Sequence, residues 1–439
     1  MAAAVVGRDP PEAELSRPPR RERGRSRAGD EMVVQIGSVA HGGSCVARHE
    51  GRAVFVRHAL PGETVRIRVT EGGEDDRFWR ADAIEIIEAS ADRVVAPCPY
   101  AAPGGCGGCD WQHAAPAAQR RMKAAVVTEQ LSRLAGLDRE IEVEAVPGDA
   151  EGLDWRTRVT YAVDSEGRPG LRRHRSHDIV TIEQCLIAHP EVRAIGVEHH
   201  RWPGAASVEA IASGSGERLV VITGAEDGPA PDARKLPDLP ADVIMAGSGS
   251  TWHTETAAGR TWQVTGSGFW QIHPGAPDTL VQAVLDGLRP VAGERAFDLY
   301  CGVGLFAGVL ADHVGPSGSV VAVEGSRQAA ADARWNLRWR DGVRVIEGRV
   351  DRVLQRRELS GRVDIVVLDP PRTGAKAPVV RSIVDRAPRA VAYVACDPAA
   401  LARDVATFGE LGYQLDTVRA FDLFPMTHHV ECVAILRPG

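Results

Sequence analysis

The stretch FDLYCGVGLFAGVLA, residues 297–311, decides the fold of this chain. An apolar strand ends there at Asp298–Tyr300, a turn carries Gly302 and Gly304, and an apolar helix follows. Glycine permits a tight turn and lets the backbone approach a ligand without a Cβ in the way. The pattern therefore predicts a strand–turn–helix unit that binds a cofactor at the turn.

The same rhythm continues on both sides of this unit. Apolar strands alternate with amphipathic helices from about residue 276 onward, which is typical of βαβ units joined into a parallel sheet. We therefore predict an α/β, Rossmann-like domain over residues 276–439, with helices on both faces of the sheet. The predicted strands are RAFDLY (295–300), GSVVAVEG (318–325), VRVIEG (343–348), VDIVVLD (363–369) and AVAYVACD (390–397).

Acidic residues stand at the carboxyl ends of three predicted strands. They are Asp298, Glu324, which follows 26 positions later, and Asp369 in VVLDPPRTG. A carboxylate in the position of Glu324 can accept both hydroxyls of a ribose. The two prolines after Asp369 hold its carboxylate rigidly in the crevice where ligands bind such sheets.

The turn differs from a dinucleotide fingerprint. The third glycine of that pattern is replaced by Ala307, and Asp298 would repel phosphates yet suits the ammonium group of a methionine. S-adenosylmethionine is therefore the better ligand. We assign to its site Asp298, Gly302, Gly304, Glu324 and Asp369.

Cys396 ends another apolar strand, and Asp397-Pro398 begins the next helix. We expect the helix dipole to lower the pKa of this thiol. A thiolate beside a methyl donor suits uracil, because C5 of uracil is a poor nucleophile until a thiolate adds at C6. Cys396 is therefore the candidate nucleophile.

Glu431, in DLFPMTHHVECVAILRP, is the candidate base that removes the C5 proton. It lies at the entry to the final apolar strand, and a carboxylate in a dry site can have a raised pKa and accept a proton. We interpret His428 and His429, just before it, as a structural corner.

Two other functions stay open. One is methylation of an adenine or guanine amino group, for which Cys396 would be dispensable. Against it, Arg372 stands where the Asp-Pro-Pro loop of such enzymes has an aromatic residue that stacks on the base. The other is an RNA-binding iron–sulfur protein without catalysis, against which the intact pair Cys396 and Glu431 speaks.

The N-terminal part of the chain divides in two. Residues 1–31 are rich in Pro, Arg and Glu and have too few apolar residues to offset the entropy lost on ordering, so we expect a disordered basic tail, with Met32 as an alternative start. Residues 32–90 alternate apolar and polar positions between glycine turns, which predicts an OB-like β-barrel of a kind that often binds nucleic acid.

Residues 91–275 form the predicted central α+β domain, which carries a cysteine cluster. Cys98, Cys106 and Cys109 are followed by Cys185, and four thiolates can hold a [4Fe–4S] cluster or a zinc ion. The arginines of WRTRVTYAV and LRRHRSHD could hold RNA phosphates, although a solvated face is an equally good interpretation. They are Arg156, Arg158, Arg172, Arg173 and Arg175.

The bulk composition of the 439 residues is that of a globular protein, with 44% hydrophobic and 25% charged residues. No apolar run is long enough to span a membrane, and because the first residues lack a charged region followed by a long apolar stretch, we expect no secretory signal. A net charge of −7 argues against a uniformly basic surface. We expect a cytoplasmic monomer with RNA as partner, no membrane and no obligate protein partner.

In combination, FDLYCGVG, LDPPRTG, ACDPAALARD and DLFPMTHHVE resemble the RNA uracil-5-methyltransferases, which act on tRNA or 23S rRNA. The resemblance runs from about Met32 to Leu436 and implies that Cys396 is the nucleophile and Glu431 the base. It further implies a TRAM barrel, a structural [4Fe–4S] cluster and a preference for ribosomal RNA over tRNA. Cofactor contacts are implied for Gln271, Tyr300, Glu324 and Asp369, and base stacking for Phe269.

Three positions depart from the family pattern. His273 replaces a usual Asn, Leu305 takes a position that is polar in some relatives, and Arg349 stands where an amide or acid would meet the adenine. We carry no cofactor contact onto these three residues.

Overall fold

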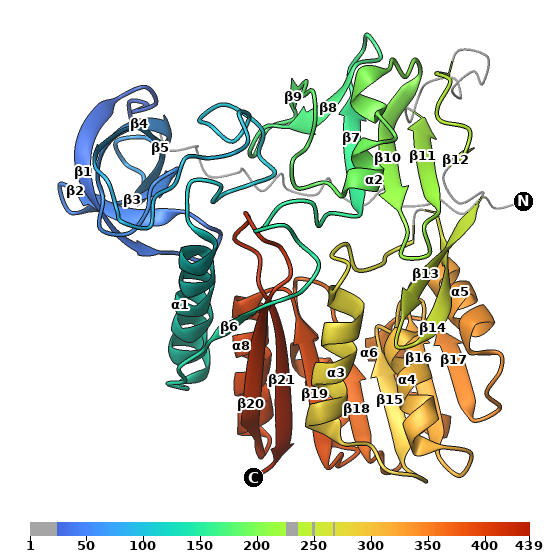
Figure 1. Ribbon diagram of the computed structural model, residues 1–439. Helices are drawn as coiled ribbons and strands as arrows, with labels where there is room; N and C mark the ends of the chain where they lie inside the picture. The colour runs from blue at the N-terminus through green and yellow to red at the C-terminus, as the bar shows by residue number, and fades with distance from the viewer. Residues whose placement is uncertain (1–23, 225–235, 248–250, 267) are drawn as a thin grey trace, which may run out of the picture.

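The computed structural model describes residues 24–224, 236–247, 251–266 and 268–439. Three bodies are visible in Figure 1: a barrel at the N-terminal end, a central sheet, and a larger α/β body that contains the C-terminus. Within the described residues, no helix is long and apolar enough to cross a membrane.

The first body is a closed five-stranded barrel in the order β1-β2-β3-β5-β4. Its strands alternate inward apolar and outward polar side chains, so that Val54, Val56, Val65 and Ile67 are fully buried. The predicted OB-like barrel is thus confirmed. The strands are β1 (Glu31–Val39), β2 (Cys45–His49), β3 (Arg52–Arg57), β4 (Thr64–Glu71) and β5 (Phe78–Glu88).

Part of the predicted disordered tail belongs to this barrel. The backbone N–H groups of Arg27 and Gly29 donate to the carbonyls of Gly72 and Val69, and the Arg27 guanidinium lies over the Trp79 ring. The expectation of disorder is therefore wrong for residues 24–31, because backbone pairing with the barrel replaces the missing apolar residues. Residues 1–23 lie outside the described part of the chain.

The central body is a six-stranded sheet in the order β12-β11-β10-β7-β8-β9, with its own apolar core around Trp155, Tyr161 and Trp202. A short helix, α2 (Pro190–Arg193), and a 3₁₀ turn over residues 197–199 pack beside it. The strands are β7 (Arg158–Val163), β8 (Pro169–Arg172), β9 (Ile179–Val180), β10 (Ala205–Ala212), β11 (Arg218–Gly224) and β12 (Val243–Gly247).

The α/β body is built on an eight-stranded sheet in the order β17-β16-β15-β18-β19-β21-β20-β6. Strands β15 to β19 are parallel, as predicted, and β21 runs antiparallel between β19 and β20. The strands are β6 (Val143–Ala145), β15 (Arg295–Leu299), β16 (Ser319–Glu324), β17 (Val343–Glu347), β18 (Ile365–Leu368), β19 (Ala390–Ala395), β20 (Tyr413–Asp422) and β21 (Glu431–Pro438).

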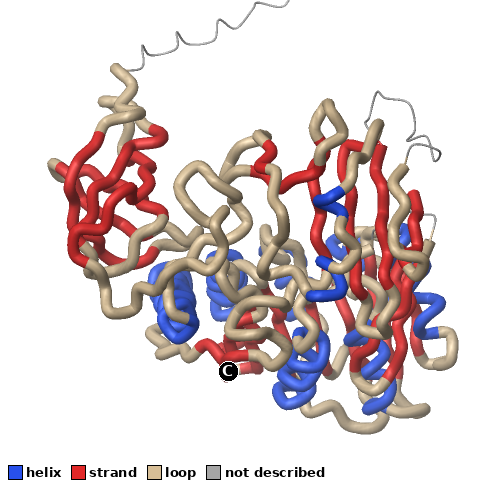
Figure 2. Tube along the Cα trace, turned by 45° about the horizontal axis from the view of Figure 1, so that its top comes forward, coloured by secondary structure: helices blue, strands red, loops and turns tan. Residues whose placement is uncertain are grey.

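Helices cover both faces of this sheet, so its central strands are apolar on both sides, as parallel strands require (Figures 1 and 2). One apolar core holds α3 (Ala276–Leu288), α4 (Leu305–Val314) and α5 (Arg327–Leu337). The other core holds α1 (Pro116–Ala135), α6 (Val350–Val353), α7 (Lys376–Val384) and α8 (Pro398–Glu410).

Three segments that precede residue 276 pack on the α/β body. Helix α1 lies against α8, and β6 pairs with β20 at the edge of the sheet. The hairpin β13 (Trp252–Ala257) and β14 (Arg260–Thr265) buries Trp262 and Val264 in the core of α3, α4 and α5. The predicted division at residue 276 thus does not follow the packing, because apolar side chains of these segments complete the two cores.

Candidate active site

The predicted site residues meet at one edge of the sheet, where the parallel strands end. Strands β15 and β18 are neighbours with Leu299 paired to Leu368, so Tyr300 and Asp369 leave the sheet side by side. Connections from β15 and β18 run to opposite sides of this point, and the crevice at such a switch point is where open α/β sheets bind ligands.

Asp298 is fully buried at the centre of this edge. Its Oδ2 accepts a hydrogen bond from the Ala307 N–H at 2.7 Å, whereas its Oδ1 has no partner among the described residues. Burial, followed by the charges of Asp369 and Glu324, raises the pKa of Asp298 to about 8. An unpaired buried carboxylate oxygen fits a cationic ligand, which agrees with the ammonium assigned to it.

The glycine turn after β15 leaves open space beside Glu324. Gly302 has a φ of 53°, and a Cβ built on it would meet no atom of the described residues within 4 Å. Its N–H donates to Glu324 Oε2 at 2.9 Å, while the Ser326 N–H donates to Oε1 at 2.6 Å. Gly304 has a different reason for being glycine, since a Cβ there would lie 2.8 Å from Leu337 Cδ1.

Tyr300 and the segment before α3 carry the remaining predicted contacts to cofactor and base. Tyr300 has a φ of 65°, a left-handed conformation that costs energy for a residue with a Cβ and is frequent at functional sites. Phe269 is 66% exposed, while Trp270 beside it is buried and Gln271 is partly buried. An exposed phenyl ring is available to stack on a base.

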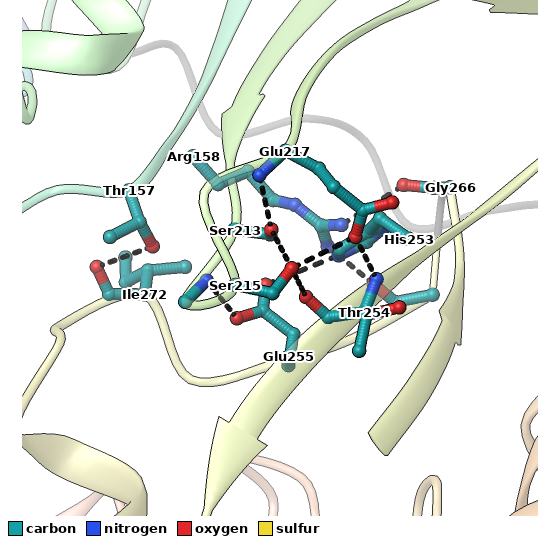
Figure 3. A network of polar contacts seen from close by, with 12 residues as sticks. Thr157, Arg158, Ser213, Ser215, Glu217, His253, Thr254, Glu255, Gly266 and Ile272 are labelled. Carbon is teal, nitrogen blue, oxygen red and sulfur yellow. Dashed lines mark hydrogen bonds and ion pairs between the residues drawn. The ribbon is translucent and has the colours of Figure 1, made fainter. Parts of the chain in front are cut away.

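Arg158 of β7 holds this segment in place (Figure 3). Its guanidinium donates to the carbonyls of Gly266, at 2.9 Å, and Gly268, and lies 3.6 Å from Glu209. The idea that Arg158 grips an RNA phosphate is therefore wrong, because its donors are used inside the protein. Nothing in the sequence pattern distinguished it from the exposed arginines.

Strand pairing brings the candidate nucleophile and base together. Ala395 on β19 is paired with Cys432 on antiparallel β21, so Cys396 follows its strand at the point where Glu431 begins the other. Glu431 is buried, and burial together with the charge of Asp369 raises its pKa well above the usual value. The thiol, the base and a cofactor carboxylate thus share one site.

The expectation of a lowered thiol pKa is wrong. Burial and the charges of Glu431 and Asp369 raise the pKa of Cys396 to about 11, and Arg372 opposes this only in part. The dipole of α8 does not prevail, because its N-terminus is already capped by Asp397, whose Oδ1 accepts from the Ala400 N–H at 2.7 Å.

Two contacts from distant parts of the chain hold the loops around Cys396 and Glu431. His41, in the barrel loop after β1, lies 3.1 Å from Asp397 through its Nε2, although the two are 356 positions apart. Asp110, next to Cys109, accepts from His428 Nδ1 at 2.6 Å across 318 positions. No pattern in the sequence pointed to either pair, and the predicted histidine corner contacts the cysteine loop through a hydrogen bond from His428 to Asp110.

Comparison with known proteins decides the family. Residues 25–79 match the TRAM domain and residues 278–438 match the tRNA (uracil-5-)-methyltransferase family. An uncharacterized RNA methyltransferase of Streptomyces avermitilis is 53% identical over 94% of this chain and 99% of its own. The 23S rRNA (uracil(1939)-C(5))-methyltransferase RlmD of Chromohalobacter salexigens is 32% identical over 99% of this chain and 95% of its own.

The chain belongs to the RNA uracil-5-methyltransferase family. Its fold is also that of the Pyrococcus abyssi tRNA (uracil-54, C5)-methyltransferase in complex with S-adenosyl-L-homocysteine, with a TM-score of 0.67 at 22% identity over 92% of this chain and all of the other. The comparisons thus favour uridine methylation over methylation of an amino group and over a protein without catalysis.

The positions that depart from the pattern of RNA uracil-5-methyltransferases have structural partners. His273 is buried, stacks on Trp155 with ring centroids 5.9 Å apart, and accepts from the Gly275 N–H. Leu305 is the first residue of α4 and belongs to the apolar core of α3, α4 and α5. Arg349 forms a two-bond ion pair with Asp351 at 2.8 and 3.1 Å.

The four cysteines of this methyltransferase lie near one another. The pKa of Cys109 shows this proximity: burial raises it most, and the charges of Cys185, Cys106 and Cys98 raise it further. Within the described residues, however, no group of three or more His, Cys, Asp or Glu side chains is arranged to hold a metal ion. The predicted metal site is thus not supported by the side-chain arrangement.

Proposed function

We propose that this chain transfers a methyl group from S-adenosylmethionine to C5 of a uridine in RNA, with Cys396 as nucleophile and Glu431 as base. The observation that carries the proposal is the cross-strand placement of Cys396 and Glu431 at the same sheet edge as Asp298, Glu324 and Asp369. A methyl donor alone would not require a thiol there.

The residues at the switch point fit the cofactor. Ionised Asp298 would hold the methionine ammonium through its unpaired Oδ1, and Glu324 would accept ribose hydroxyls beside the open face of Gly302. We assign Gln271, Tyr300, Gly304 and Asp369 to the same pocket. Bound S-adenosylmethionine supplies the electrophilic methyl group.

The protein side of the chemistry consists of a bond made, a proton removed and a bond broken. The Cys396 thiolate adds to C6, and the electron pair of the C5–C6 double bond moves to give an enolate whose C5 takes the methyl group. Glu431 then removes the C5 proton. The electrons left behind restore the double bond as the sulfur leaves C6, which returns the thiolate. The raised pKa of Glu431 makes it an effective proton acceptor.

RNA that contains 5-fluorouridine tests this sequence of steps, because fluorine cannot leave C5 as a proton. We expect a covalent protein–RNA adduct, stable in denaturing gels, with the unmodified protein and none with Cys396→Ala. Cys432→Ala is the matched control, since this neighbouring thiol is fully buried and should leave the adduct intact. Methyl transfer by Cys396→Ala would overturn the proposal.

We infer 23S ribosomal RNA as the substrate rather than tRNA. The support is the 32% identity to the 23S rRNA enzyme over 99% of this chain, against a likeness in fold alone to the tRNA enzyme. Loss of a 5-methyluridine from 23S rRNA in a deletion strain is the expected result. A 5-methyluridine lost from tRNA instead would show that the inference is wrong.

We further propose that Cys98, Cys106, Cys109 and Cys185 hold a structural [4Fe–4S] cluster, with zinc as the alternative. The chemistry of the donors fits thiolates, because each sulfur accepts N–H groups: from residues 100 and 101, from Gly108, from the Gln112 amide, and from residues 187 and 188. Anaerobic preparations should contain about four iron and four sulfide per chain; one zinc per chain would replace the cluster in this proposal.

A further inference from the structure

The tryptophan side chains of this protein fall into two groups. The chain has nine, of which Trp79, Trp111, Trp155, Trp202, Trp262 and Trp270 are buried. The other three are 53%, 52% and 42% exposed: Trp252, Trp335 and Trp339. All three line one groove, which is separate from the site around Cys396. Leaving three large apolar rings in water is unfavourable, so their gathering in one place calls for a ligand.

The groove lies between the hairpin β13–β14 and the C-terminal end of α5, and its volume is about 950 Å³. The hairpin turns one face to the core with Trp262 and Val264, and its other face lines the groove with hydroxyl and amide groups. Thr254, Thr256 and Thr261 contribute these hydroxyls.

The hairpin is fixed from the side of the central sheet, so the groove is preformed (Figure 3). The Thr254 N–H donates to Glu217 at 2.6 Å, and the Ser215 hydroxyl donates to the Thr254 carbonyl at 2.7 Å. Glu255 accepts from the Gly214 N–H at 2.7 Å. A rigid floor reduces the entropy that a ligand must lose on binding.

Arginines are stacked on the exposed rings. The Arg260 guanidinium lies 3.9 Å from the centroid of Trp339, and Arg338 lies at the same distance from Trp335. Arg340 also faces Trp339, at 4.9 Å. Asp312 pairs with Arg260 and Arg340, which orients them. Flat rings, guanidinium planes and hydroxyls are the combination that binds single-stranded nucleic acid by base stacking and phosphate contact.

The groove is placed to bind nucleotides that flank the target. Helix α5 starts three residues after Glu324 at the cofactor edge, and Trp335 lies nine residues after its N-cap, Ser326. At about 1.5 Å per residue, the groove is roughly 14 Å from that edge. A strand whose uridine is in the active site can therefore reach it.

We propose that this tryptophan groove is a second RNA-binding site, which stacks unpaired bases of the substrate outside the catalytic pocket. The inference rests on the proposed function in that the ligand is the substrate RNA. The stacking is independent of base identity, since every base has an aromatic face. The groove therefore adds affinity and reach without reading sequence.

Binding of a fluorescent 12-nucleotide oligouridylate, followed by anisotropy with the full-length protein, tests the groove. Trp335→Ala and Trp339→Ala should each raise the dissociation constant about tenfold. Trp335→Phe keeps an aromatic face and should remain close to the parent. Val291→Ala removes an exposed apolar side chain outside the groove and serves as the control.

An unchanged dissociation constant for the double variant Trp335→Ala/Trp339→Ala would overturn the proposal and indicate a protein partner instead. The double variant should still form the adduct with a short RNA that contains 5-fluorouridine, because the groove does not touch the reacting atoms. If the parent protein forms no adduct but the variants lose oligouridylate binding, the proposed function fails and the groove stands.

Discussion

The two halves of the active site are built in different ways. The cofactor half, with Asp298, Glu324 and Asp369, is made by strand ends and turns within one continuous stretch of the α/β body. The nucleophile half is held by other bodies: the barrel contacts Asp397, and the cysteine loop contacts His428. The difference indicates that cofactor binding depends on the α/β body alone, whereas the positions of the candidate thiol and base depend also on the barrel and the cysteine loop.

Replacing the candidate base should have the largest effect on methyl transfer, and this effect should be confined to the nucleophile half of the site. Glu431→Gln is expected to lower methyl transfer about 10²- to 10⁴-fold, because the C5 proton would lose its acceptor. Affinity for S-adenosylmethionine, measured by calorimetry, should stay close to that of the parent. A large loss of cofactor affinity would show that the two halves are not separate.

The pKa of the Cys396 thiol offers a second test that concerns the nucleophile half alone. With a pKa of about 11, alkylation of Cys396 by iodoacetamide should accelerate about tenfold per pH unit from pH 7 to 10, since only the thiolate reacts. Mass spectrometry of the peptide that contains Cys396 would measure the rate. Glu431→Gln removes a charge that raises this pKa and should accelerate alkylation at pH 8; a rate already constant above pH 7 would contradict the assignment.

Asp298 probes the cofactor half. Its pKa is raised to about 8, so the neutral form dominates at lower pH and a cation binds only after ionisation. The dissociation constant for S-adenosylmethionine should therefore fall about tenfold from pH 6 to pH 7, as the ionised fraction of Asp298 grows, and should level off above about pH 8. Asp298→Asn keeps the shape and should bind more weakly, without this pH dependence.

Removing the contact between His41 of the barrel and Asp397, next to Cys396, should have the smallest effect. His41→Asn is expected to lower methyl transfer about two- to fivefold, in the range of a partly exposed ion pair, with cofactor affinity unchanged. The hydrogen bond to Asp397 raises the pKa of His41, so the charge is present below that pKa and lost above it. The defect should accordingly shrink in alkaline buffer; a defect that grows there would exclude the ion pair as its cause.

The cofactor half could be predicted from sequence because its geometry is local. Parallel strands end at one edge of a sheet, so residues that follow them, such as Asp298 and Asp369, must meet. Glu431 was predicted from its place at the entry to the last strand and from the resemblance to the family, and the antiparallel pairing of β21 explains its position.

The rest depended on contacts over long distances in the chain. His41 and Asp397 are hundreds of positions apart, and no periodicity in the sequence connects them. The predicted direction of the Cys396 pKa shift was wrong, because burial and the charges of Glu431 and Asp369 outweigh the effect of a capped helix end. Arg158 looked like its exposed neighbours, although backbone carbonyls take its donors.

The small strand β6 has a practical consequence. By pairing with β20 it closes one edge of the main sheet, and α1, just before it, covers apolar residues of β20 and α8. A fragment that began at residue 276 would therefore expose both an unpaired strand and an apolar face, a combination that favours self-association. Anyone who isolates the catalytic body for biochemical work should keep residues 116–145 attached to it.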